Sequence, residues 1–249
     1  QAALAQTLNV NPSAADNVEY SVLTRENRGD FVYTLEKIGT RGEGNWIELE
    51  SVSQTTDPEK VALVVYPDKL GPLLSADGSS DFPWLKNLLD RRYHVYRVRG
   101  FASGRLSVSL REWDSYSWSD AYNRSNLSNG ILDTVTAIQS IREAYPDLPL
   151  TLIGLDSKGP ATACAAALDG KTDRVVVDIN KIDLDYWRAV QQVIPAHGFA
   201  RTGGIKTVLL LLAESELILF NSADSYDFSW MTDRLSRIGF IDNLTILGK

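Results

Sequence analysis

The sequence predicts an α/β protein with a doubly wound, mainly parallel sheet and an antiparallel hairpin near the N-terminus. Strand-like apolar runs alternate along the chain with amphipathic helical segments, which is the order of βαβ units. The segment VALVVYP at 61–67 is nearly all apolar and β-branched, as in a strand buried on both faces. We therefore expect one domain over 1–249, with an N-terminal helix and hairpin over 1–55 and the parallel-sheet core over 56–249.

Local patterns predict the individual elements. Ala2–Leu8 is expected to be a short helix, and a polar loop with Pro12 follows it. Segments 31–37 and 46–52 alternate apolar and polar residues, and the glycines between them supply a hairpin turn. The run Val208–Ala213, which follows a glycine pair, has the length of a strand. The other predicted strands are 61–67, 93–98, 150–155, 174–179, 216–220 and 244–247, and the predicted helices are 82–90, 127–144, 161–168 and 230–238.

Composition and charge exclude several classes of function. A net charge of −7 argues against a nucleic-acid partner, because a phosphate backbone needs clustered Lys and Arg. No apolar run approaches the roughly 20 residues that span a bilayer. The most basic stretch interleaves its arginines with apolar residues, so we interpret it as a strand with polar ends. Its basic residues are Arg91, Arg92, Arg97, Arg99 and Arg105.

The chain has one cysteine and two histidines, which limits its metal chemistry. Cys164 lies on the apolar face of a predicted helix, and we expect it to be a small buried residue. One cysteine excludes a disulfide within the chain and a cysteine-based metal site. We expect no metal and no cofactor. Because the chain begins at Gln1, we expect that a leader, a tag or a preceding domain was removed, and the location, secreted or periplasmic among the options, stays open.

The stretch LIGLDSKG at 152–159 predicts a strand, a tight corner and the start of an Ala-rich helix. A serine hydrolase places its nucleophile on such a corner in the pattern G-x-S-x-G. With Ser157 as nucleophile the first small residue is missing, because Leu155 stands there. With Gly154 as the first small residue, the nucleophile position falls on Asp156 and Lys158 replaces the second one. Both registers stay open, and so does the structural alternative in which Asp156 or Ser157 only caps the helix.

A serine esterase also needs a base and an acid. His94 lies inside a predicted strand, and His197 in a loop, so His197 is the only candidate base. In the order Ser…Asp…His the histidine follows the last strand, but the chain ends at Lys249 without one. The candidate acids are Asp224 and Asp227, which follow the strand at 216–220.

Several segments together resemble the α/β-hydrolase domains of bacterial acetyl xylan esterases, in particular a degenerate second domain found in large tandem proteins of that group. The resemblance runs from about Val61 to Ile238 and includes the unusual Tyr-Asn-Arg at 122–124. It implies an α/β-hydrolase fold, with the nucleophile site at Asp156 or Ser157 and the acid at Asp224 or Asp227. The segments that carry it are VVYPDKLGPLLSADG, AYNRSNLSNGILDTVTAIQSI, LIGLDSKGPATACAAAL and ELILFN.

The same resemblance places the oxyanion-hole segment at 66–68, where the chain reads Tyr-Pro-Asp, and finds no residue matching the base. We therefore expect a hydrolase-fold domain that has lost catalysis and works as a structural or interaction module, with a partner esterase domain or carbohydrate as its partner. The alternative is a working esterase for acylated carbohydrate, with Ser157 as nucleophile and either His197 or an unusual group as base. The expected sugar-binding rings in the long loop 99–125 are Trp113, Trp118 and Tyr122, unless these rings only pack the loop onto the domain.

Overall fold

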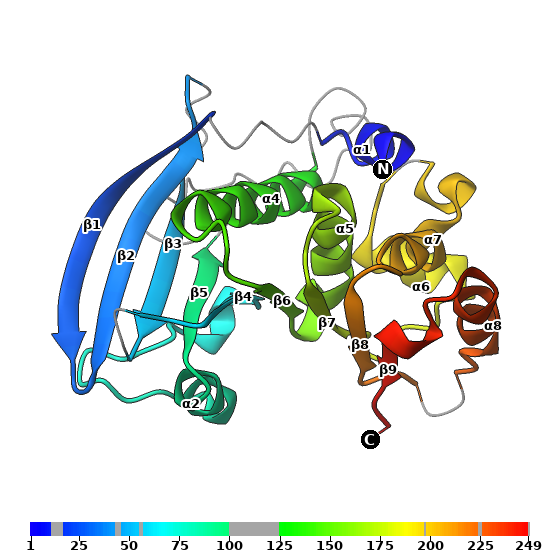
Figure 1. The fold of residues 1–249 in the computed structure, drawn as a ribbon. Coiled ribbons are helices and arrows are strands. Elements are labelled where there is room, and N and C mark those ends of the chain that lie inside the picture. The colour runs from blue at the N-terminus through cyan, green and yellow to red at the C-terminus, as the bar shows by residue number, and fades with distance from the viewer. Residues whose placement is uncertain are drawn as a thin grey trace.

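The computed structural model describes residues 1–10, 17–42, 46–54, 57–99, 125–196, 198–223 and 226–248. These residues form a nine-stranded sheet in the order β1-β2-β3-β5-β4-β6-β7-β8-β9, flanked by helices (Figure 1). The strands are β1 (Val18–Arg28), β2 (Phe31–Thr40), β3 (Trp46–Ser53), β4 (Lys60–Val65), β5 (Tyr93–Arg99), β6 (Leu150–Gly154), β7 (Arg174–Asp178), β8 (Glu216–Phe220) and β9 (Leu244–Ile246). The helices are α1 (Ala2–Thr7), α2 (Pro83–Asp90), α4 (Asn126–Ala144), α5 (Gly159–Asp169), α6 (Trp187–Val193), α7 (Gly204–Leu211) and α8 (Ser229–Ile238).

The sheet is antiparallel at its N-terminal side and parallel beyond it. Strands β1, β2 and β3 pair antiparallel, and β3 pairs antiparallel with β5. Every further pair, from β5–β4 to β8–β9, is parallel. The predicted fold class is therefore confirmed. Strand β4 has β5 on one side and β6 on the other, so the order of the strands reverses there, and such a switch point is where open α/β sheets bind ligands.

Alternate residues of the central strands enter two different hydrophobic clusters, as strand geometry requires. In β4, Leu63 belongs to a large cluster that also holds residues of α1, α4, α5, α7 and α8. Its neighbour Val64 belongs to a smaller cluster that contains residues of α2. In β5, Val98 and Val95 divide between the two clusters in the same way. Both faces of the parallel sheet are thus covered, which explains the continuous apolar runs in the sequence.

The predicted strand at Val208–Ala213 is wrong, because this run forms the second half of α7 and the turn after it. Val208 and Leu209 are buried, whereas Leu211 on the other side of the helix is 40% exposed. Leucine is a good helix former, and a run of leucines does not distinguish a helix from a strand by its pattern. No described helix is both long and apolar enough to cross a membrane.

The single cysteine lies where the sequence predicted. Cys164 is fully buried in α5, and burial raises the pKa of its thiol to about 12. Its thiolate is therefore unpopulated at neutral pH, and the residue acts as a small apolar side chain. Among the described residues, no three His, Cys, Asp or Glu side chains are grouped so that they could hold a metal ion.

Candidate active-site elbow

The corner between β6 and α5 has the backbone of a sharp strand-to-helix turn. Asp156 opens a short 3-10 helix over Asp156–Lys158 and has φ of 54°, in the left-handed region that residues other than glycine rarely adopt. The flanking glycines allow close approach: Gly154 brings β6 against α5, and Gly159 brings α5 against the end of β7. A Cβ at Gly154 would lie 2.6 Å from Cβ of Thr162, and one at Gly159 would lie 1.9 Å from the carbonyl oxygen of Asp178.

The backbone places Asp156 at the tip of this elbow and Ser157 one residue beyond it. The tip of a nucleophile elbow is the strained position, with a small residue two places before it, and Asp156 with Gly154 meets both conditions. Lys158 stands at the second small position, and Gly159 provides the close approach one residue later. Neither Asp156 nor Ser157 caps α5, because no side chain accepts a capping hydrogen bond from the first N–H groups of this helix.

The carboxylate of Asp156 is held by polar contacts on both of its oxygens. Its Oδ1 accepts a hydrogen bond from the Ser157 N–H at 2.6 Å, and its Oδ2 lies 3.6 Å from Nζ of Lys69. The amide that follows a nucleophile is one of the two oxyanion-hole donors in this type of elbow. Here that N–H already has an acceptor, and the acceptor carries a negative charge.

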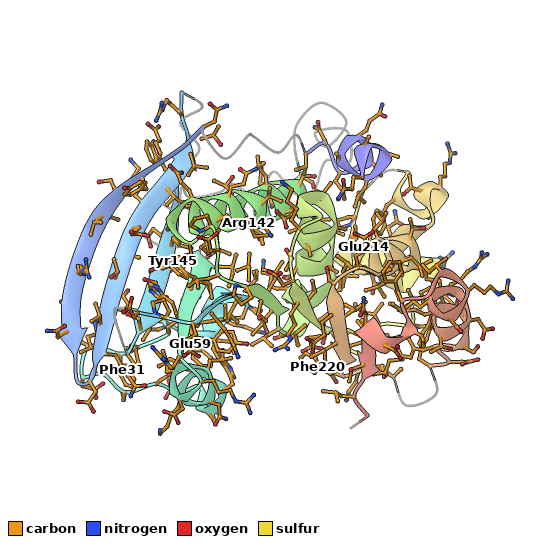
Figure 2. The ribbon with its side chains drawn as sticks, in the orientation of Figure 1. Phe31, Glu59, Arg142, Tyr145, Glu214 and Phe220 are labelled. Atoms are coloured by element: carbon orange, nitrogen blue, oxygen red, sulfur yellow. The ribbon has the colours of Figure 1, made fainter. Side chains whose placement is uncertain are left out.

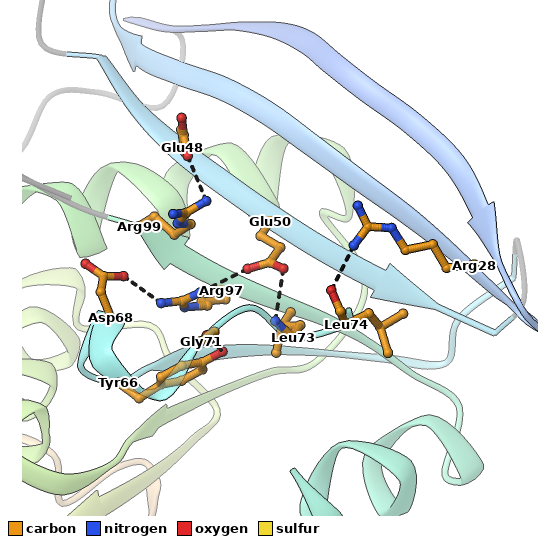
Figure 3. A network of polar contacts seen from close by, with 10 residues as sticks. All are labelled: Arg28, Glu48, Glu50, Tyr66, Asp68, Gly71, Leu73, Leu74, Arg97 and Arg99. Carbon is orange, nitrogen blue, oxygen red and sulfur yellow. Dashed lines mark hydrogen bonds and ion pairs between the residues drawn. The ribbon is translucent and has the colours of Figure 1, made fainter. Parts of the chain in front are cut away.

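The loop after β4 faces the elbow, since Lys69 within it reaches Asp156. It contains Pro67, which has no N–H to donate. The Tyr66 hydroxyl donates to the Gly71 carbonyl at 3.1 Å, and Asp68 accepts from Nη2 of Arg97 at 2.6 Å (Figure 3). These two contacts fix the shape of the loop, and neither involves a histidine or a serine.

A buried ion-pair network lies behind that loop, on strands β3 and β5. Arg97 and Glu50 are direct cross-strand partners, with 3.2 Å between Nη1 and Oε2, and both are at most 1% exposed. Glu50 also accepts from the Leu73 N–H at 2.9 Å, and Glu48 pairs with Arg99 at 3.1 Å (Figure 3). Burial raises the pKa of Glu50, while Arg97 acts in the opposite direction.

This network corrects the interpretation of the basic stretch as a strand with polar ends. Arg97 is 1% exposed, and its guanidinium carbon lies 4.3 Å from the centroid of the Tyr66 ring. The side chain is inside the protein because two carboxylates neutralise it and an aromatic face covers it. Sequence patterning does not reveal such a pairing, because Glu50 and Arg97 are far apart in the chain.

Two polar side chains beside the elbow were missed by sequence reasoning: Asp178 at the end of β7 and Asn221 directly after β8. Asp178, at the end of β7, accepts from the Asp156 N–H at 2.9 Å and from Nδ2 of Asn221 at 2.8 Å. It also accepts from the Asn180 N–H at 2.7 Å. Asp178 therefore supports the backbone of the corner. The sequence contained a signal for this role, because Asp178 stands at the carboxyl end of the buried strand β7, which is the neighbour of β6.

The remaining predicted site residues are not brought together by the described part of the chain. His197, Asp224, Trp113, Trp118 and Tyr122 lie outside the described residues. Asp227 is described, and its carboxylate accepts from the Ser229 N–H and hydroxyl, both at 2.8 Å, at the start of α8. Those hydrogen bonds lower the pKa of Asp227, which is the behaviour of a turn residue.

His94 is far from the elbow. It pairs with Val61 at the beginning of β4, whereas Gly154 beside the elbow pairs with Val65 at the end of that strand. Four residues of strand correspond to about 13 Å. The Nδ1 atom of His94 instead lies 2.9 Å from the hydroxyl of Tyr145. The described residues thus provide no histidine base at the elbow.

Comparison with solved structures shows which known fold this chain shares. The chain is similar to a glucuronoyl esterase from Solibacter usitatus, with a TM-score of 0.59 at 12% identity over 99% of this chain and 86% of that one. It is also similar to acetyl xylan esterase 1 from Thermoanaerobacterium sp., with a TM-score of 0.54 at 14% identity over 99% and 84% of the two chains. No protein-family model and no curated protein matches the sequence. The shared architecture is the α/β-hydrolase fold, and this chain has it.

Proposed function

We propose that this chain is a relative of the carbohydrate esterases of acetyl xylan type whose elbow has lost serine catalysis and whose fold serves as a structural or interaction module. The observation that carries the proposal is the carboxylate at the tip of the elbow. Asp156 occupies the nucleophile position, and its Oδ1 accepts the N–H of Ser157 at 2.6 Å.

Ester hydrolysis requires an oxyanion hole that is free when the tetrahedral intermediate forms. A carboxylate bound to one of its donors competes with the oxyanion for that donor and repels its charge. Nζ of Lys69, 3.6 Å from Oδ2 of Asp156, adds a second polar partner that holds the carboxylate at this position. Pro67 removes one N–H from the facing loop. These features favour a site that binds no acyl transition state.

The experiment is hydrolysis of p-nitrophenyl acetate and of an acetylated xylo-oligosaccharide by the purified chain, beside Asp156→Asn and Ser157→Ala. Asp233→Asn is the matched control, since Asp233 is an exposed residue of α8. We expect all four proteins to give the rate of buffer alone. Turnover by the wild type that disappears in one elbow variant and persists in Asp233→Asn would overturn the proposal.

A working ester hydrolase is the second candidate, because the left-handed φ of Asp156 preserves the strain of an active elbow. In that case the nucleophile would be either the strained Asp156 or the exposed Ser157, with His197 as the base of Ser157 and sugar held by Trp113, Trp118 or Tyr122. Activity lost in Ser157→Ala but retained in Asp156→Asn would identify Ser157. Activity lost only in Asp156→Asn would instead identify a carboxylate nucleophile.

A further inference from the structure

A cavity of about 450 Å³ lies at the edge of the sheet opposite the elbow. It is lined by strands β1, β2, β3 and β5 and by the last residues of α4. In Figure 1, β1, β2 and β3 curve around one end of the long helix α4, and Figure 2 labels Tyr145 at that end. The volume is within the range of about 300–1,000 Å³ typical of small-molecule sites. This cavity is separate from the elbow. His94 in its lining lies at the beginning of β5, whereas the elbow lies at the other end of the parallel strands.

A row of polar side chains crosses the floor of the cavity. The register pairs Arg25 with Thr34, Thr34 with Ser51, and Ser51 with Tyr96 across four adjacent strands. All four residues line the cavity. A sheet face covered by a helix is normally apolar, so a polar row under the end of α4 is unexpected in a surface that serves only packing.

A bulge in β1 brings Arg25 into this row. The pairing of β1 with β2 shifts between Val22 and Thr24. Tyr20 and Val22 line the cavity before the shift, and Arg25 lines it after the shift. In a regular strand residue 25 would face away from residues 20 and 22, because side chains alternate. Bulges re-aim side chains and often accompany binding sites.

Three aromatic rings form one wall. The rings of His94 and Tyr96 lie 4.3 Å apart, and the Tyr145 ring stands edge-on to His94 at 5.6 Å. Nδ1 of His94 and the Tyr145 hydroxyl are 2.9 Å apart. Burial lowers the pKa of His94 to about 4, so the imidazole is neutral at neutral pH. The wall therefore combines ring surface with uncharged polar groups.

The charges of the lining nearly cancel. Arg25 contributes one positive charge, and Glu36 and Glu143 contribute carboxyl groups. Burial raises the pKa of Glu36, while Arg25 lowers it. A strongly anionic ligand would meet these carboxyl groups, and an apolar ligand would leave the hydroxyl and guanidinium groups without water or partners. A ring with hydroxyl groups and C–H faces satisfies both the polar row and the aromatic wall.

We propose that this cavity binds a short neutral saccharide, one or two sugar units long, at a site separate from the elbow. The C–H face of a sugar would pack on the Tyr145 and Tyr96 rings. Its hydroxyl groups would bond to Arg25, Thr34 and Ser51. The proposal does not depend on whether the elbow is catalytic.

The test is a calorimetric titration of the whole chain with xylobiose and with cellobiose, and the same titration with glucuronate and with cyclohexanol. Arg25→Ala and Thr34→Val are the cavity variants, since each removes a side-chain group that would bond to a sugar hydroxyl. Arg91→Ala is the matched control, because Arg91 is exposed at the end of α2 and outside the cavity lining. We expect a neutral disaccharide to bind, and each cavity variant to weaken it about tenfold, as loss of one hydrogen bond does, while Arg91→Ala binds as the wild type.

Four outcomes with these ligands and variants would overturn the proposal. They are no binding of either disaccharide at millimolar concentration, unchanged affinity in both cavity variants, equal weakening by Arg91→Ala, and tighter binding of glucuronate or cyclohexanol. Thermal unfolding of each variant controls for folding, and Arg25, an exposed residue of an edge strand, keeps the test valid if Thr34→Val is unstable. Asp156→Asn completes the set, because a loss of sugar binding there would place the sugar at the elbow instead. Ester hydrolysis, measured separately, decides the proposed function.

Discussion

Gly159 is the residue on which the geometry of the elbow depends most directly. A Cβ there would lie 1.9 Å from the backbone oxygen of Asp178, and backbone cannot move aside as a flexible side chain can. We expect Gly159→Ala to reduce the free energy of unfolding by about 1–3 kcal/mol, as overpacking does. Urea unfolding measures the change.

The matched control is Gly130→Ala in α4, where the added Cβ has no neighbour within 4 Å. Alanine is favoured over glycine inside a helix by about 1 kcal/mol, so this variant should be at least as stable as the wild type. Equal effects of the two substitutions would show that the close contact at Gly159 is absent.

Arg97 allows a second prediction at the scale of single residues. Its partner Glu50 is fully buried, so Arg97→Ala leaves a carboxylate without its counter-ion inside the protein. We expect a loss of about 3–5 kcal/mol in the free energy of unfolding. Arg92→Ala removes an arginine whose ion pair with Glu59 is half exposed, and it should cost at most about 1 kcal/mol.

The two substitutions are compared by urea unfolding under identical conditions. The double variant Arg97→Met/Glu50→Leu separates the charge from the packing. It should recover much of the stability lost in Arg97→Ala, because no buried carboxylate is left without its counter-ion; Asp68, the other partner of Arg97, is 43% exposed to water. A double variant that is less stable than Arg97→Ala would show that the unpaired Glu50 carboxylate does not cause the loss, since Glu50 also accepts the Leu73 N–H.

At the scale of elements, the contact between β5 and the end of α4 predicts a pH dependence. His94 has a pKa of about 4 in the folded protein, because burial and then Arg25 disfavour its charged form. In the unfolded chain its pKa is about 6.5. Between these values the unfolded chain binds the additional proton, so stability is full above about pH 6.5 and falls as the pH falls toward 4.

The expected loss from His94 between pH 7.5 and pH 5 is about 2 kcal/mol. His94→Gln cannot bind the proton and keeps a polar group near Tyr145, so it should lose less stability over the same interval. Urea unfolding of both proteins at the two pH values gives the difference. Parallel losses in wild type and variant would contradict the low pKa of His94.

Elements with a clear burial pattern were predictable from the sequence, whereas elements that depend on distant partners were not. Strand β4 is buried on both faces and β2 and β3 form the predicted hairpin, so their patterns are clear. Strand β1 was missed, because it is an edge strand with Tyr20, Val22 and Leu23 exposed and polar residues between them.

The elbow was predictable as a shape, since a strand, Gly154 and Pro160 mark it. Its tip residue followed only from the φ of Asp156.

At the scale of the whole molecule, the single domain expected from the sequence predicts that the chain unfolds in one step. One sheet runs without interruption from β1 to β9, and β3 of the N-terminal segment is hydrogen-bonded to β5 of the parallel part. The large hydrophobic cluster contains Leu4 and Ile38 together with Leu235. The N-terminal segment 1–55 therefore shares a core with the segment 56–249.

Shared burial of this kind couples the unfolding of the two segments, since neither can separate without exposing apolar surface of the other. We expect urea unfolding followed by tryptophan fluorescence and by far-ultraviolet circular dichroism to give one transition with the same midpoint. The single variant Ile38→Ala, at a fully buried position of β2, should shift both curves together by the same amount. Two separated transitions, or a shift seen by one probe alone, would divide the chain into independently folding parts and place their boundary between β3 and β4.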